Sequence, residues 1–174
     1  MAGLARSLGN LFDAFDAEAF RLETLDDYSQ SGSVDAYGLF RDGQKKPPDY
    51  NADWLEEVKA HVDAGRRMYR VHILTRPLTP YLRFELGWGY VTNATAGEEF
   101  FILDLTDRPN PLPGVGDFWL FDSVTAAPMH YSHDGKFLGA DVLPDDRGPE
   151  YVTYRDTALA NAVPFVDWWA RHGE

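Results

Sequence analysis

Residues 69–103 read YRVHILTRPLTPYLRFELGWGYVTNATAGEEFFIL. Its first six residues, 69–74, are typical of a strand, and residues 100–103 form a second compact apolar strand. Between them, the hydroxyl and proline of Thr79-Pro80 predict the start of a helix that ends at Gly97. A strand, a helix and a strand in this order predict a right-handed parallel crossover, which indicates an α/β fold.

Further strands are predicted on both sides of this unit. Residues 20–25 alternate between apolar and polar, and residues 118–121 form a short apolar run. A hairpin follows, with its turn at Asp134-Gly135. We therefore expect a mixed, mostly antiparallel sheet with one parallel crossover unit and helices packed on its faces.

The remaining helices are marked by their apolar spacing and by their ends. One covers residues 8–15, and a second begins after an Asn51 cap and ends at Gly65. Near the C-terminus, Pro164 is expected to kink or restart the last helix. The adjacent Trp168-Trp169 cannot both be buried on one narrow helix face, so one of them could anchor a partner or a homodimer; the alternative is that both pack across a broad buried helix face.

The length of 174 residues predicts a single domain over residues 1–174. Two segments inside it lack regular patterning. Residues of about 29–50 are rich in Gly, Ser, Asp and Pro and are expected to be mostly irregular, and residues of about 106–116 form a Pro/Gly-rich loop.

The composition narrows the function classes. There are 16 Lys and Arg against 28 Asp and Glu, a net charge of −12, which argues against direct nucleic-acid binding and against anionic membrane surfaces. The chain has no cysteine, so disulfides, thiolate nucleophiles and cysteine metal sites are excluded. Residues 1–10 lack the apolar core of a signal peptide, and we expect a cytoplasmic protein.

The strand at residues 69–74 carries unexpected polar side chains. Alternation puts Val71 and Ile73 on one face and Arg70 and His72 on the other. Both faces of a crossover strand are usually covered and apolar, so a cation beside an imidazole indicates a polar site. The alternative is an edge strand whose second face meets water.

The following helix places an acid between apolar surfaces. Glu85 falls between two apolar arcs, so it should be partly buried and should find a cation or bind a proton. Gly87 and Gly89 each cost about 1 kcal/mol inside a helix, which favours close approach of another backbone or a ligand. A buried structural ion pair with tight packing is the alternative interpretation.

These observations define one candidate pocket at the carboxyl end of the first crossover strand, where open α/β sheets place ligands. Its candidate ligand-binding residues are Arg70, His72, Arg76, Tyr81, Arg83 and Glu85. If the protein is an enzyme, His72 and Glu85 are its candidate catalytic residues, and Arg70 or Arg83 would hold an anionic substrate.

No cofactor or metal site is expected from the sequence. No Gly-rich phosphate loop, nucleophile elbow or H-E-x-x-H motif is present. His130 and His133 fall on opposite faces of a strand next to the hairpin turn, where exposed histidines are the better explanation.

Several motifs together resemble an uncharacterised actinobacterial domain-of-unknown-function family. They are AFRLE at 19–23, RVH at 70–72, PLTPYLRFE at 77–85, AGE at 96–98 and DFWLFD at 117–122. The resemblance implies a setting near helix-turn-helix regulators and supplies no catalytic residues. The element order is also similar to half of a phospholipase D-like fold, although the His-x-Lys-x4-Asp signature of the active enzymes is absent.

Two functions remain open at this point. The first is a regulatory or binding protein without catalysis, which senses a small anionic ligand or contacts a partner such as a helix-turn-helix regulator; the acidic balance suits a basic partner. The second is a small-molecule enzyme that uses the Arg/His/Glu pocket.

Overall fold

A computed structural model describes residues 6–32 and 34–173. Residues 1–5, which belong to the segment that lacks the apolar core of a signal peptide, lie outside the described residues. The helices are α1 (Leu8–Ala14), α2 (Val34–Arg41), α3 (Ala52–Asp63), α4 (Pro80–Phe84), α5 (Val91–Asn93), α6 (Gly148–Asn161) and α7 (Phe165–His172). The strands are β1 (Glu18–Glu23), β2 (Arg67–Leu74), β3 (Glu99–Asp104), β4 (Phe118–Phe121), β5 (Thr125–Tyr131), β6 (Phe137–Ala140) and β7 (Val163–Pro164).

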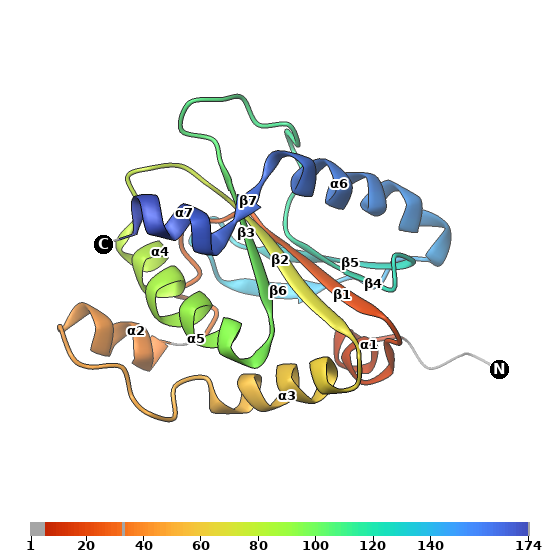
Figure 1. Ribbon diagram of the computed structural model, residues 1–174. Helices are drawn as coiled ribbons and strands as arrows, with labels where there is room; N and C mark the ends of the chain where they lie inside the picture. The colour runs from red at the N-terminus through yellow and green to blue at the C-terminus, as the bar shows by residue number, and fades with distance from the viewer. Residues whose placement is uncertain (1–5, 33, 174) are drawn as a thin grey trace.

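The strands form one mixed sheet in the order β6-β5-β4-β1-β2-β3-β7 (Figure 1). Strands β2 and β3 pair in parallel, as the sequence of residues 69–103 predicts. The pairs β1–β4, β3–β7, β4–β5 and β5–β6 are antiparallel. The α/β class and the mixed, mostly antiparallel sheet are therefore confirmed. The structure adds a second parallel crossover, because β1 also pairs in parallel with β2.

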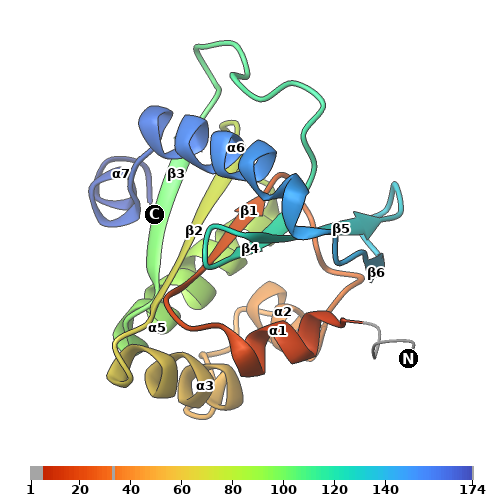
Figure 2. The ribbon, with the colours of Figure 1, turned by 90° about the vertical axis from the view of Figure 1, so that its right-hand side faces the viewer.

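The two faces of the sheet carry different side chains. One face is apolar: Phe20, Leu22 and Val71 pack with residues of α6 in the main core. The other face is covered by α1, α3, the α4–α5 helix and α7 (Figure 2). Apolar clusters occupy both ends of this second face, and the polar side chains of β1 and β2 lie between them.

The helix that follows β2 begins as predicted and then changes its winding. Thr79 caps it by accepting from the Leu82 amide, and Pro80 occupies the first turn. The segment Glu85–Tyr90 is π-helical, and a short 3-10 turn ends at Gly97 in a left-handed conformation. π-helical turns are frequent at functional sites because the extra residue per turn displaces side chains from the regular helix face.

Two local expectations need correction. Helix α2 lies inside the segment expected to be mostly irregular, and its Tyr37 and Phe40 pack on Phe84, so tertiary contacts and not local propensity stabilise it. Asn51 precedes α3 but its side chain does not cap the helix, since it is left-handed and donates to Asn93 instead.

The C-terminal region restarts at Pro164, one of the two outcomes expected. Helix α6 ends at Asn161, the pair Val163–Pro164 adds an edge strand to β3, and α7 begins at Phe165. The hairpin at Asp134-Gly135 also forms, with Gly135 in a left-handed conformation. Within the described residues, no helix has both the length and the apolar character that a membrane crossing requires.

Candidate functional site

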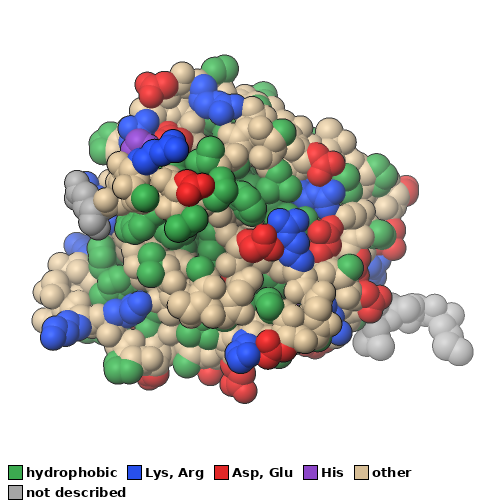
Figure 3. Space-filling view, viewed as in Figure 1, with side chains coloured by type: hydrophobic (Ala, Val, Ile, Leu, Met, Phe, Trp, Pro, Cys, Tyr) green, Lys and Arg blue, Asp and Glu red, His purple; other side chains and the backbone are tan. Residues whose placement is uncertain are grey.

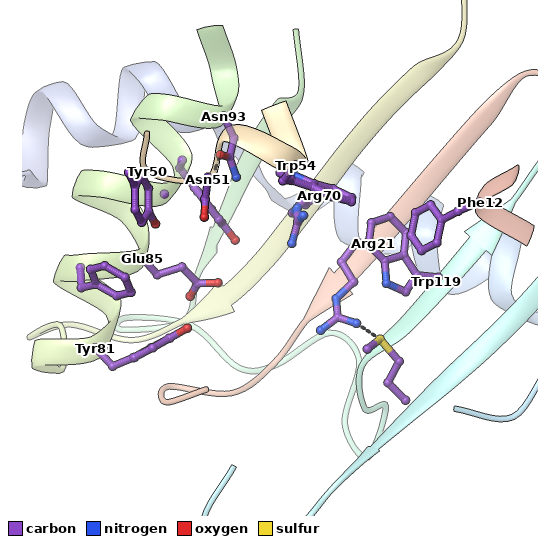
Figure 4. A pocket seen from close by; sticks show the side chains of 14 residues that line it. Phe12, Arg21, Tyr50, Asn51, Trp54, Arg70, Tyr81, Glu85, Asn93 and Trp119 are labelled. Carbon is purple, nitrogen blue, oxygen red and sulfur yellow. Dashed lines mark hydrogen bonds between the residues drawn. The ribbon is translucent and has the colours of Figure 1, made fainter. Parts of the chain in front are cut away.

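A cavity of about 360 Å³ lies on the polar face of the sheet (Figure 4). Its walls come from α1, the start of α3, the α4–α5 helix and strands β1, β2, β4 and β5. Half of the 14 lining residues are aromatic, namely Phe12, Tyr50, Trp54, Tyr81, Phe84, Tyr90 and Trp119. Arg21, Arg70 and Glu85 reach the same cavity, which gives it the mixture of apolar walls and few polar groups that is common in small-molecule sites.

The polar side chains converge because two parallel strands are in register. Arg21 of β1 lies beside Arg70 of β2, and Glu23 lies beside His72. Alternation then points all four toward the same face. Arg21, Glu23 and His72 are buried, so the interpretation of β2 as an edge strand wetted on its second face is wrong.

Arg70 is held by two carboxylates. Its Nε donates to Glu98 Oε2 at 2.9 Å, and its Nη1 donates to Glu23 Oε1 at 3.2 Å. Trp54 Nε1 donates to the other Glu98 oxygen at 3.0 Å. Glu98 is almost completely buried, and its carboxylate joins β2 to α3.

Arg21 forms a second buried ion pair. Its Nη2 donates to Asp117 Oδ2 at 2.9 Å and to the Tyr131 hydroxyl at 3.0 Å, and its guanidinium also contacts the Met129 sulfur. Its Nε is buried and has no hydrogen-bond partner in the described part of the chain. Arg21 is also one of the side chains that line the cavity (Figure 4).

His72 and Glu85 face each other at the floor of the cavity. His72 Nδ1 is 3.6 Å from Glu85 Oε2 and 3.1 Å from the Tyr90 hydroxyl. The same hydroxyl donates to Glu23 Oε1 at 2.5 Å. Glu85 Oε2 is buried and has no hydrogen-bond partner among the described residues.

The two carboxyl groups of this floor have opposite pKa shifts. Burial, the charge of Glu23 and a hydrogen bond with Glu23 raise the pKa of Glu85 well above its ordinary value. Burial opposes ionisation of Glu23 as well, but Arg70 and His72 outweigh it and hold the pKa of Glu23 below its ordinary value. When the pair holds a single proton, that proton therefore lies on Glu85.

One group of three side chains in the described part of the chain could hold a metal ion. Glu23, His72 and Glu85 each offer one ligand atom, and these atoms lie within 4.8 Å of one another. The sequence did not indicate this group, because Glu23 comes from a different strand. His130, by contrast, is exposed and its Nε2 lies 2.7 Å from Asp141 Oδ2 at the surface.

The candidate residues fall into two places. The structure brings Arg70, His72, Tyr81 and Glu85 together at the cavity, with His72 behind its lining. Arg76 and Arg83 lie instead in a separate groove between the α4–α5 helix and α7. Arg76 is bound there to Asp104 at 2.6 Å, and Arg83 is exposed on the opposite side of α4 from the cavity.

The groove is the larger of the two hollows and has a volume of about 880 Å³. Trp88 and Trp169 contribute apolar surface to it, and Arg171 adds a cation. In the space-filling view, apolar side chains gather over the α4–α5 helix and α7 (Figure 3). Arg76 and Arg83 therefore belong to a surface distinct from the buried polar cluster.

Sequence reasoning missed Arg21, Glu23, Glu98 and Asp117. Glu98 directly follows the glycine that ends a helix, where a charged residue is usually solvated, but it is buried against Arg70 and Trp54. Asp117 directly precedes a strand, where an aspartate often forms a turn, but it pairs with Arg21. The available signal was the alternation of residues 19–23, which places Arg21 and Glu23 on one face of β1.

Comparison with known proteins identifies one family. The family model described as "Domain of unknown function (DUF6879)" matches residues 6–170. No curated protein and no solved structure matches the chain.

Proposed function

The chain belongs to this family, the domain of unknown function DUF6879, and from that premise we propose that the protein binds a small, flat, mostly apolar molecule that carries a carbonyl or carboxylate oxygen. In this proposal the protein senses the molecule and does not convert it. The cavity beside Arg21, Arg70 and Glu85 is the binding site.

The observation that carries the proposal is an aromatic cavity with unsatisfied polar atoms at its edge. Tyr50, Tyr81 and Trp119 offer flat surfaces that suit a planar ring. The buried Nε of Arg21 lacks an acceptor, and an unsatisfied buried donor costs about 1–3 kcal/mol. An acceptor oxygen on the ligand would recover that free energy.

Charge favours an acceptor over a cationic group. Asp117, Glu23 and Glu98 each already have a guanidinium partner, Arg21 for Asp117 and Arg70 for the two glutamates. The raised pKa of Glu85 favours its protonated form, which can donate to an oxygen. A carboxylate would meet two guanidinium groups at the cavity wall.

Binding of 2-naphthoate, measured by saturation-transfer NMR, tests this proposal against the size-matched cation 2-naphthylmethylamine. We expect the carboxylate to bind and the amine to bind at least tenfold more weakly. Gly89→Met should fill the cavity, since Gly89 lines it, and should abolish binding in a folded protein. Equal binding of both compounds, or binding that survives Gly89→Met, would overturn the proposal.

A second candidate function is proton transfer on the bound molecule. It is favoured by the position of Glu85, which lines the cavity while sharing a proton with Glu23. Such a carboxyl group is a candidate general acid or base. Deuterium exchange at a C–H next to the carbonyl of 2-acetylnaphthalene, followed by NMR in D2O, would reveal it. Glu85→Gln should then stop exchange and retain binding, whereas no exchange leaves the binding function alone.

A further inference from the structure

The hydrogen-bond partners of His72 determine where its ring hydrogen lies. Nε2 is 2.9 Å from the backbone oxygen of Leu25, and a carbonyl oxygen can only accept. Nε2 therefore carries the hydrogen, and Nδ1 of the neutral ring presents a lone pair. Histidines that bind metals are commonly oriented in this way, with the second ring nitrogen donating to a backbone carbonyl.

No side chain around Nδ1 supplies a hydrogen in the described part of the chain. The Tyr90 hydroxyl is 3.1 Å away, but its single hydrogen is donated to Glu23 Oε1 at 2.5 Å. Glu85 Oε2 is 3.6 Å away and is itself buried without a partner. Once Glu85 has lost its proton, which metal binding requires, Nδ1 and Glu85 Oε2 are two electron-pair donors that face each other across a gap too wide for a hydrogen bond.

The size of this gap fits a shared metal ion. Ligand atoms bound at about 2.1 Å in a tetrahedral site lie about 3.4 Å apart, close to the 3.6 Å observed. Glu23 provides a third ligand atom within 4.8 Å of the other two. We propose that Glu23, His72 and Glu85 bind a divalent transition-metal ion at the floor of the cavity.

The ligand set indicates the class of metal. One imidazole and two carboxylates suit Zn²⁺, Fe²⁺ or Mn²⁺, whereas an all-oxygen set would favour Ca²⁺ or Mg²⁺. Arg70 Nη1 donates to Glu23 Oε1 at 3.2 Å and so orients this carboxylate. Because Glu85 lines the cavity, a fourth position would open toward the molecule of the proposed function, whose acceptor oxygen could bind the metal.

The metal itself is independent of that molecule, and Co²⁺ titration of the full chain tests it. Visible absorption reports cobalt coordination, and we expect one Co²⁺ per chain with d–d bands, displaced by Zn²⁺. Glu85→Gln replaces a carboxyl group with an amide of the same shape. His72→Gln retains a donor toward Leu25 and removes the Nδ1 lone pair. Each variant should weaken Co²⁺ binding at least tenfold.

His130→Gln is the matched control, because this exposed histidine also pairs with a carboxylate, that of Asp141. It should leave Co²⁺ binding unchanged. Absence of the d–d bands would overturn the proposed metal site, and so would bands that are lost in His130→Gln and kept in Glu85→Gln. Glu23, His72 and Glu85 would then share a proton and bind no metal ion. The Co²⁺ titration contains no organic ligand, so it tests the metal site alone. If the protein binds Co²⁺ but does not bind 2-naphthoate, only the proposed function is overturned.

Discussion

Arg70 and Glu98 form an ion pair whose acidic member is almost completely buried, with Nε 2.9 Å from Oε2 and the Glu98 side chain 1% exposed. The next residue provides an internal contrast. Glu99 pairs with Arg67 at 2.8 Å, but these side chains are 47% and 43% exposed. Two neighbouring glutamates therefore form similar contacts in very different surroundings.

Glu98→Ala should destabilise the protein by about 3 kcal/mol, because it leaves the Arg70 guanidinium buried with Glu23 as its remaining anionic partner. Glu99→Ala should cost less than about 1 kcal/mol, since an exposed pair contributes little. Urea denaturation at neutral pH measures both free energies of unfolding. Equal losses in the two variants would contradict the role assigned to Glu98.

Much of the fold could be predicted because it depends on short-range patterns. The apolar run at 118–121, the cap at Thr79 and the glycine ends at 65 and 97 each specify their element locally. Helix α2 could not be predicted, since Gly38 weakens it and its stabilising contacts with Phe84 come from a distant segment.

The candidate site was predictable only in part. Alternation on β2 correctly placed Arg70 and His72 on one face, and helical periodicity turned Glu85 toward them. The partners Glu23, Glu98 and Asp117 come from other elements, and pairing register is not visible in one segment. Arg76 and Arg83 are close to His72 and Glu85 in sequence, but they line the groove on the side of the α4–α5 helix away from the cavity.

Asp104 should make stability depend on acid pH. Burial raises its pKa, but hydrogen bonds from Thr106, Arg76 and Trp168 outweigh this and lower it to about 2. A carboxyl whose folded pKa lies below its unfolded value stabilises the protein above the unfolded value of about 4. That contribution, roughly 2 kcal/mol, is lost as the pH falls from about 4 toward 2.

Asp104→Asn should therefore lower the free energy of unfolding by roughly 2 kcal/mol between pH 5 and 8. Below pH 4, the difference in the free energy of unfolding between this variant and the original protein should shrink. Urea denaturation at pH 7, 5, 4 and 3 measures it. Asp107→Asn is the control, because Asp107 is 88% exposed and 3.6 Å from Arg76. A difference that stays constant down to pH 3 would show that Asp104 titrates normally.

Two glycines that end helices allow backbone strain to be separated from steric overlap. Gly97 and Gly65 have φ values of 104° and 84°. A Cβ on Gly97 would lie 2.9 Å from Val62 Cγ1, whereas one on Gly65 would meet nothing within 4 Å. Gly65→Ala should cost about 1 kcal/mol, and Gly97→Ala should cost about 2 kcal/mol or more.

Thermal denaturation of both variants, and of Gly97→Ala combined with Val62→Ala, measures the two contributions. The double variant removes the overlap but also removes two methyl groups of the partly buried Val62, so Val62→Ala alone is the reference. The cost of Gly97→Ala should be smaller in the Val62→Ala background. An unchanged cost would assign the whole effect to the backbone conformation.

Replacing either glycine of the π-helical segment, Gly87 or Gly89, with alanine should have a similar effect on stability but a different effect on ligand binding. Neither has a positive φ, so alanine removes the entropy of glycine and should stabilise each variant by up to about 1 kcal/mol. A Cβ on Gly87 would contact Trp169 at 3.6 Å in the groove, and one on Gly89 would contact the Tyr50 hydroxyl at 3.4 Å in the cavity. Gly89→Ala should therefore weaken 2-naphthoate binding several-fold while Gly87→Ala leaves it unchanged. Thermal denaturation and an NMR titration of each variant measure the two effects, and equal losses of affinity would show that the ligand does not occupy the cavity beside Glu85.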